Sequence, residues 1–411
     1  SGPDMSNPMR AFEDVRSALL AAATPVADIE KVSTAAALGR VLAADQVSCL
    51  QVPPLDNSSM DGYAINTADV TAAGARLTVA QRIPAGAVGH TLARGTAARI
   101  FTGAPVPRGA DAIVMQELCS TDGDSVVIDH VPKPGEWIRR AGEDIALGTT
   151  VLAAGVRLNP QMLGLAASVG CARLPVYRRL RVALFSTGDE LVMPGDPLPP
   201  GAIYNSNRYV LRGLLEALGC EVSDLGIVPD DLDATRAALR GAAAGNDLIV
   251  TSGGVSVGEE DHVKPAVQAE GQLDLWLVAM KPGKPVAFGH VNDPAGGAGA
   301  AFIGLPGNPV SSFVTFIMLV RPFVLRAMGV ADCLPREIPL TAGFDWPRPD
   351  RRREFLRARI GADGRVALFP NQGPGVLTST VWADGLVSTP PGTSLAAGAQ
   401  VQFIPYSELL S

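Results

Sequence analysis

The chain has 411 residues, more than one hydrophobic core usually holds, so about two to four domains are expected. Apolar residues make up 47% of the chain and aromatic residues only 5%, which favours buried cores of small side chains joined by many turns. The net charge of −7 excludes a general attraction to nucleic acid or to an acidic membrane surface, so any bound anion needs a local site.

The pattern of apolar residues in the first part of the chain changes twice, from helical to β and back to helical. Residues 9–45 carry the apolar spacing of two helices, the second of which closes near Gly39. From about 50 to 143, short alternating runs separated by glycine, proline and aspartate predict a small all-β module. A helical pattern returns at 159–170, where Asn159 can cap the helix and Pro160 can occupy its first turn. We therefore expect a discontinuous helical domain, 9–50 and 144–179, with a β domain inserted at 51–143.

Strands and helices alternate from residue 180 onward. The expected strands are 181–186, 221–228, 247–252, 275–280 and 300–305. The expected helices are 209–219, 230–245 and 308–329, the last with Asn308 as its cap and Pro309 at its first position. This order predicts an α/β domain with a largely parallel sheet at 180–330. Short strands after residue 330 predict a C-terminal β domain, like a small barrel, at 331–411.

The placement of cysteine, histidine and apolar residues indicates the cellular compartment, the chance of a zinc site and the chance of a membrane span. The five cysteines form no Cys-x-x-Cys pair, which favours a reduced, cytoplasmic protein without disulfides. The four histidines show no zinc-binding spacing, so no zinc site is expected. The longest apolar run, 313–320, ends at Arg321 and Pro322 and is too short to cross a membrane.

Three of the expected strands end in loops rich in glycine and in hydroxyl or amide side chains. Ligands of an α/β sheet bind outside the carboxyl ends of the strands, and such loops let backbone N–H groups approach a phosphate. Tight turns without a ligand are the alternative. No loop matches the P-loop or the dinucleotide fingerprint, which disfavours an ordinary NTPase or dehydrogenase. The candidate ligand-binding residues are Ser186, Thr187, Gly188, Ser252, Gly253, Gly254, Gly258, Gly307 and Asn308.

Acidic residues follow the same strands. Glu190, Asp231 and Asp261 lie in these loops, and carboxylates beside phosphate-binding loops suggest Mg²⁺ on a phosphoanhydride. For the neighbouring Asp230, a plain helix cap is the alternative.

Two lysines lie on one constrained turn. Lys281 and Lys284 belong to a Lys-Pro-Gly-Lys-Pro sequence, in which two prolines limit the freedom of the backbone. Ammonium groups fixed in this way suit a compact oxyanion, although a solvated surface pair is the ordinary alternative. No Ser–His–Asp or Cys–His arrangement is supported.

Together these segments resemble the molybdopterin molybdenumtransferase (molybdenum insertase) family, which includes the homologous domain of gephyrin. The matching segments are DNSSMDGYA, IFTGAPVPRGADAIV, RRAGEDI, FSTGDEL, TSGGVSVGEEDHVKP, KPGKPVAFG, GLPGNPVSS and RREFLRA. Members of the family convert adenylylated molybdopterin and molybdate into molybdenum cofactor and AMP. The resemblance implies an elongated homodimer whose α/β domain is like that of molybdopterin adenylyltransferases.

The resemblance also implies particular site residues. Asp61, in the stretch PPLDNSSMDGYAI, matches an acid that faces the α/β cleft of the other subunit, and Asp56 would order the turn. Lys281 and Lys284 match the molybdate pocket. That pocket also has an arginine, for which Arg352 is the first choice and Arg357 the second. The other matches are Thr102, Asp144, Glu190, Asp231 and Asp261, with Mg²⁺ on the last three, the pterin-nucleotide ligand Ser256, and the loop-shaping Pro306 and Pro309.

Two alternatives and one departure accompany this interpretation. The protein could instead be the preceding adenylyltransferase, although the extra β domains argue against it, or a gephyrin-like dimeric scaffold, although no long linker is present. Expected partners are a second copy, with a molybdopterin adenylyltransferase and molybdoenzyme acceptors as further possibilities; no nucleic acid and no membrane are expected. The likeness departs at Pro374 and Gly375, where relatives often carry serine.

Overall fold

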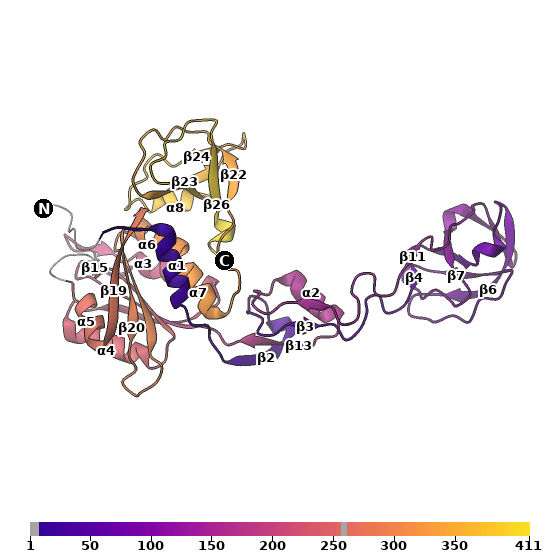
Figure 1. Ribbon diagram of the computed structural model, residues 1–411, viewed down its shortest axis with the longest axis horizontal. Coiled ribbons are helices and arrows are strands. Elements are labelled where there is room, and N and C mark those ends of the chain that lie inside the picture. The colour runs from indigo at the N-terminus through magenta and orange to yellow at the C-terminus, as the bar shows by residue number, and fades with distance from the viewer. Residues whose placement is uncertain (1–7, 256–260) are drawn as a thin grey trace.

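The computed structural model of the protein describes residues 8–255 and 261–411. The molecule is elongated, as Figure 1 shows. An α/β domain with the C-terminal β module against it forms one end, the distal β module forms the other end, and a narrow linker module joins them. The chain passes through the linker module twice, on its way to the distal module and back.

The sheet of the α/β domain is mixed. Its strands are β14 (Arg181–Thr187), β17 (Glu221–Val228), β18 (Leu248–Ser252), β19 (Gly271–Lys281), β20 (Pro285–Val291) and β21 (Ala300–Leu305). Their order is β17-β14-β18-β21-β20-β19. The first four are parallel, and β20 is antiparallel to both of its neighbours. The five predicted strands are confirmed. Strand β20, which follows β19 through a short turn, is not among them and is also the exception to the expected parallel direction.

Helices cover both faces of this sheet. They are α1 (Phe12–Ala22), α3 (Asn207–Ala217), α4 (Leu232–Ala243), α5 (Val263–Glu270), α6 (Pro309–Thr315) and α7 (Arg321–Met328). One core contains residues of α1, α3, α6 and α7 with alternate residues of the central strands, and a second core contains residues of α4 and α5 with the intervening strand residues. The short strands β1 (Arg10–Ala11), β15 (Leu191–Val192) and β16 (Ile203–Tyr204) complete the domain.

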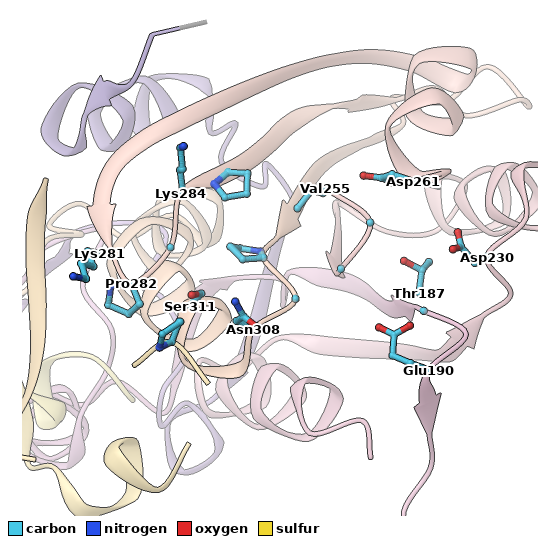
Figure 2. A pocket seen from close by; sticks show the side chains of 18 of the residues that line it. Thr187, Glu190, Asp230, Val255, Asp261, Lys281, Pro282, Lys284, Asn308 and Ser311 are labelled. Carbon is cyan, nitrogen blue, oxygen red and sulfur yellow. The ribbon is translucent and has the colours of Figure 1, made fainter. Parts of the chain in front are cut away.

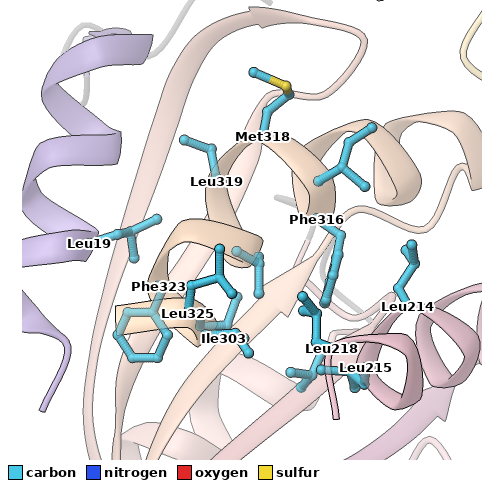
Figure 3. Packing of buried hydrophobic residues seen from close by; sticks show 14 of the residues in the cluster. Leu19, Leu214, Leu215, Leu218, Ile303, Phe316, Met318, Leu319, Phe323 and Leu325 are labelled. Atoms are coloured by element: carbon cyan, nitrogen blue, oxygen red, sulfur yellow. The ribbon is translucent and has the colours of Figure 1, made fainter. Parts of the chain in front are cut away.

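The helical run Pro309–Met328 is the centre of the larger core. A π-helical segment, Phe316–Val320, joins α6 to α7. In Figure 3, Phe316 of this run lies on the side of the leucines of α3, whereas Leu319 and Phe323 lie on the side of Leu19 of α1. Of the helices in the described ranges, this run alone is long and apolar enough to cross a membrane, but 94% of its most apolar window is buried inside the protein. An all-round apolar helix of this kind is typical of a protein core.

The linker module differs from the expected helical domain. Residues 29–33 form strand β2 (Ile29–Ser33), paired antiparallel with β13 (Arg173–Tyr177), so the second predicted helix is wrong. Pairing with a distant strand rich in apolar residues outweighs a local helical pattern. Helix α1 is confirmed, but it packs into the α/β core through Phe12, Val15 and Leu19. The module's other elements are β3 (Gln46–Val47), β12 (Thr150–Leu152) and α2 (Pro160–Ser168).

The helix expected near 159–170 is present as α2. Asn159 Oδ1 accepts a hydrogen bond from Met162 N at 3.0 Å, and Pro160 is the first helical residue, as predicted. The helix packs its apolar face into a small core that includes Leu158, Ala166 and Leu174. The α-helix of the linker module therefore comes from the part of the chain that returns from the distal module, within the predicted segment 144–179.

The distal β module is a six-stranded sheet with its own cores. Its order is β8-β5-β7-β6-β10-β9. The strands are β5 (Gly62–Ile65), β6 (Ala75–Ile83), β7 (Thr96–Ile100), β8 (Ala112–Met115), β9 (Cys119–Asp122) and β10 (Ser125–Ile128), and a ladder of β4 (Asn57–Ser58) with β11 (Ile138–Arg139) closes its base. The all-β texture predicted for this stretch is confirmed.

The C-terminal β module continues the α/β sheet. Its elements are β22 (Ile338–Thr341), β23 (Arg353–Ile360), β24 (Val366–Leu368), β25 (Gly385–Thr389), β26 (Gln400–Pro405) and α8 (Thr378–Trp382). The last residues of β19 pair parallel with the first residues of β23, Met280 with Arg353 and Lys281 with Glu354. This short join places the start of β23 beside the turn that carries both lysines.

Arg178 connects the linker module to the α/β domain. Its two Nη atoms donate to Asp247 and its Nε donates to Asp28, each at 2.9 Å. Burial alone would raise the pKa of Asp247, but the hydrogen bonds from Arg178 and from the Arg181 N–H, with the charge of Arg178, outweigh it and lower this pKa.

Replacing Asp247 by Asn should destabilise the protein by roughly 1–3 kcal/mol at pH 7. Because the folded-state pKa of Asp247 lies below its unfolded value, this stability is fully present above about pH 4 and is lost as the pH falls further. Urea unfolding at pH 7 and at pH 3 measures the difference. The exposed Asp332→Asn serves as control, and an equal deficit at both pH values would contradict the prediction.

Candidate functional site

Three glycine loops at the carboxyl ends of β14, β18 and β21 meet at one cavity of about 570 Å³. The rest of its wall comes from the loop after β17, the first turn of α6, the lysine turn between β19 and β20, and two loops of the C-terminal β module. Figure 2 shows this cavity from close by. The predicted residues that line it are Thr187, Gly188, Glu190, Gly253, Gly254, Asp261, Lys281, Lys284, Pro306, Gly307, Asn308 and Arg352.

The second loop requires glycine for steric reasons. Gly253 and Gly254 have φ angles of 79° and 74°. A Cβ on Gly254 would lie 2.4 Å from Val263 Cγ2, and a Cβ on Gly253 would lie 2.9 Å from Thr187 O. The loop thus lies directly against the first loop and the start of α5, and its backbone, without side chains, forms the cavity wall.

One end of the cavity is acidic. Glu190, Asp230 and Asp261 lie together at this end in Figure 2. Asp261 Oδ1 accepts a hydrogen bond from Val263 N at 3.1 Å, while Oδ2 is buried without a hydrogen bond among the described residues, 3.9 Å from Lys264 Nζ. Burial is the largest effect on this carboxyl and raises the pKa of Asp261. The end therefore offers a desolvated carboxylate oxygen.

Asp231 is not part of this acidic end. Its carboxylate caps α4 by accepting a hydrogen bond from Ala234 N at 3.0 Å. The neighbouring Asp230 lines the cavity instead. The placement of Asp231 among the cavity acids is therefore wrong by one residue, because the residue that caps the helix turns its side chain to the helix N–H groups.

The opposite end of the cavity is basic. Lys281 and Lys284 come from the turn between β19 and β20, and Arg352 comes from the residue before β23. Asp350 accepts hydrogen bonds from the N–H and Nε of Arg352, at 2.8 and 3.0 Å, and lies 3.7 Å from Lys281 Nζ. These contacts lower the pKa of Asp350 to about 2, the hydrogen bond from the Arg352 side chain having the largest effect. The cluster can hold a compact oxyanion.

Several predicted residues lie outside the cavity wall. Ser186 and Ser252 are buried behind it, with their hydroxyl oxygens 3.1 Å apart. Pro309 starts α6, next to the lining residue Asn308. The predicted residues Ser256 and Gly258 lie outside the described residues.

The C-terminal β module supplies two further lining residues, neither of which was predicted to bind the ligand. Gln372 and Pro374 line the cavity, as does Ser311 of α6. The carbonyl of Pro374 accepts a hydrogen bond from Val310 N in the first turn of α6, at 3.0 Å. Gly375, the other position where relatives often carry serine, is not part of the lining.

Arg357, the second choice for the oxyanion pocket, is a buried support of this wall. It is 1% exposed and does not line the cavity. Its guanidinium donates to Phe355 O, Ser379 Oγ and Gly373 O, at 2.9, 3.1 and 3.4 Å. Burial lowers the pKa of Arg357 to about 10. The preference for Arg352 agrees with this geometry.

The remaining predicted acids lie in or beside the distal β module, far from the cavity of the same chain (Figure 1). Asp61 Oδ1 accepts hydrogen bonds from Thr102 N and Oγ1, both at 2.9 Å, and these lower the pKa of Asp61. Asp144 is exposed, and its N–H donates to Val52 O. One chain does not bring these residues to the α/β cavity.

Asp56 ties together the two passes of the chain at the base of the distal module. Its carboxylate accepts hydrogen bonds from Ala141 N at 2.7 Å and from Arg140 Nη1 at 3.0 Å. The two acids of PPLDNSSMDGYAI thus differ in environment. The role expected for Asp56 within its own turn is wrong: its carboxylate instead accepts from Ala141 and Arg140, on the returning pass of the chain.

Replacing Arg357 by Met should destabilise the C-terminal β module by roughly 1–3 kcal/mol, because the carbonyls of Phe355 and Gly373 would lose their buried donor. Hydrogen exchange in the 371–376 loop should also become faster. Mass-spectrometric hydrogen exchange measures the second effect and urea unfolding the first. The exposed Arg351→Met is the control, and unchanged exchange in the Arg357 variant would contradict the prediction.

The chain matches families of molybdenum cofactor biosynthesis along most of its length. Residues 10–170 match the MoeA N-terminal region (domain I and II), 183–326 a probable molybdopterin binding domain, and 339–406 the MoeA C-terminal region (domain IV). A protein of Mycobacterium tuberculosis named molybdopterin molybdenumtransferase 2 is 42% identical, over 89% of this chain and 92% of its own.

Two further comparisons agree. A molybdopterin molybdenumtransferase of Haemophilus influenzae is 42% identical over 78% of each chain. The crystal structure of a molybdopterin biosynthesis MoeA protein from Pyrococcus horikoshii has a TM-score of 0.83 at 27% identity, covering 97% of this chain and 100% of that chain. The domain matches and the relatives lead to one conclusion: this chain belongs to the molybdopterin molybdenumtransferase family.

Proposed function

We propose that this protein inserts molybdenum from molybdate into adenylylated molybdopterin, giving molybdenum cofactor and AMP. The observation that carries the proposal is the single cavity with an acidic end, a basic end and glycine loops between them. The names of the relatives support the same reaction. A substrate with a phosphoanhydride and a separate oxyanion needs these two environments within one site.

The glycine loops are suited to the pterin phosphate and the adenylate. They lie at the carboxyl ends of β14, β18 and β21, where helices α4 and α6 begin close by. Backbone N–H groups at such positions favour anions, and glycines allow a phosphate to come close. Lys281, Lys284 and Arg352 would then gather molybdate at the basic end, beside the dithiolene sulfurs of the bound pterin.

The acidic end fits Mg²⁺ that arrives with the substrate. Mg²⁺ commonly uses one or two carboxylates together with phosphate oxygens and water. Asp261 offers a buried oxygen without a hydrogen bond among the described residues, and Glu190 and Asp230 lie at the same end. The described residues hold no cluster of three or more His, Cys, Asp or Glu of metal-site geometry, so substrate oxygens must complete the coordination. When bound, Mg²⁺ polarises the phosphoanhydride and balances the charge that builds during cleavage.

The proposal includes a homodimer. Asp61 and Thr102 are held by two hydrogen bonds on a module that does not reach the cavity of its own chain. A second copy lying alongside in the opposite direction would bring its distal module to that cavity, as a closed two-fold arrangement allows. The five unpaired cysteines support a reducing compartment, and we place the reaction in the cytoplasm.

Replacing Asp261 by Asn should slow AMP release by at least about tenfold, because the desolvated carboxylate oxygen is lost while the glycine loops that bind substrate remain. Chromatographic measurement of AMP from adenylylated molybdopterin, with molybdate and Mg²⁺ present, tests this. The matched control is Asp293→Asn, in the exposed turn after β20. AMP release at the wild-type rate would remove Asp261 from the mechanism.

Mixing two impaired variants tests the dimer. Asp61→Asn and Asp261→Asn should each retain no more than about a tenth of wild-type activity as homodimers. If Asp61 serves the cavity of the other copy, re-associated mixtures should recover about a quarter of wild-type activity, since half of the dimers are mixed and each has one intact site. The same proteins mixed without dissociation are the control. No recovery in verified mixed dimers would show that Asp61 does not act across subunits.

A further inference from the structure

Asp350 is the one acidic residue in direct contact with the basic end of the cavity among the described residues. Its Oδ1 accepts the N–H and Nε of Arg352, and its Oδ2 lies 3.2 Å from Arg352 Nη2. Its backbone is fixed as well, since Asp350 O accepts a hydrogen bond from Gly392 N at 2.7 Å. The carboxylate is therefore firmly held against the guanidinium.

The contact with Lys281 is of a different kind. Lys281 Nζ lies 3.7 Å from Asp350 Oδ2, beyond ordinary hydrogen-bond distance, and the lysine side chain is 45% exposed. Asp350 itself is 20% exposed and does not line the cavity, whereas Lys281 and Arg352 do. The carboxylate thus acts on the basic end from outside the cavity, and a ligand can approach Lys281 without meeting it.

The charges of the basic end balance a dianion. Lys281, Lys284 and Arg352 each contribute one positive charge, and Asp350 removes one. The remaining positive charge equals the negative charge of molybdate. Without Asp350 the same pocket would carry a surplus, and each surplus charge a few ångströms from the ligand strengthens anion binding considerably.

We propose that Asp350 is a positioning residue that orients Arg352 toward the cavity and weakens oxyanion binding by competing with the ligand for Lys281. The inference deepens the proposed function, because it takes molybdate as the oxyanion of this end. A site that transfers its oxyanion must bind it without trapping it, and common anions such as sulfate must leave easily. An internal carboxylate that shares the cations provides this balance.

The variant Asp350→Asn separates the two roles. Its amide oxygen can still accept from the N–H and Nε of Arg352, so two of the three hydrogen bonds that orient the guanidinium remain. The negative charge and the hydrogen bond from Nη2 to Oδ2 are removed. Calorimetric titration with molybdate alone should show a dissociation constant about tenfold lower than in the wild type. The salt dependence should also become steeper. Asp345→Asn, exposed in the same module and accepting only from Ala397 N among the described contacts, is the control with the same change in net charge.

A double-mutant cycle distinguishes competition from a structural effect. In the Lys281→Gln background the gain from Asp350→Asn should fall to roughly threefold, because one of the contested cations is absent. A merely structural change would give the same gain in both backgrounds. In turnover assays the KM for molybdate should fall, and the KM for adenylylated molybdopterin should stay unchanged.

Unchanged or weaker molybdate binding by Asp350→Asn would overturn the inference, as would an equal gain in both backgrounds or an equal gain in Asp345→Asn. Failure of the proposed function is a separate result. A wild-type protein that releases no AMP and forms no molybdenum cofactor would reject the function, whatever the binding constants of the variants.

Discussion

The candidate site depends on two residue pairs between strands. Met280 pairs with Arg353 and Lys281 with Glu354, and this is where the α/β sheet joins the sheet of the C-terminal β module. Because Arg352 directly precedes β23, this join places Arg352 beside the turn that carries Lys281 and Lys284. Neither domain alone holds the complete cluster of cations. The oxyanion end is thus a property of the join between two domains. The larger core is also shared across this join, since it includes Phe355, Leu386 and Ile404, although the C-terminal module has a second core of its own.

As a consequence, the charge of the cavity lining changes from negative at one end to positive at the other. Carboxylates lie at the end formed by the segments after β14, β17 and β18, and cations lie at the end where the C-terminal module meets the sheet. A long substrate with a phosphoanhydride at one end and metal-binding sulfurs at the other can lie in this field in one orientation only. Electrostatic preorganisation of this kind is the usual basis of phosphoryl chemistry. Asp350 contributes to the same electrostatic field, since its negative charge, just outside the cavity, reduces the positive charge of the basic end.

The sequence predicts most elements of the α/β domain, because five of its strands are short apolar runs and its longer helices have amphipathic spacing. It misses strand β20 and helix α5. The loops at the strand ends follow from that order, which is why most of the expected residues line one cavity. The strand at 29–33 was missed because its partner, 173–177, is far away in sequence and no local pattern shows the pairing. Asp230 was passed over for Asp231 because the side chains of adjacent residues point apart, and only the cap geometry separates them. Gln372 carried no chemical signal, and Pro374 was noted only as a departure from the relatives, since the place of both residues depends on how a separate module docks.

The hydrogen bond from Val310 N to the carbonyl of Pro374 fastens the C-terminal module to the first turn of α6. It occupies an amide in the first turn of α6, and such amides attract anions. Tilting the C-terminal module away would release this donor at the rim of the cavity. An anion that took the vacated amide would favour the tilted arrangement, whereas one bridging Arg352 and the lysines would favour the closed one. Since such coupling is reciprocal, the angle between the domains would report which kind of anion is bound.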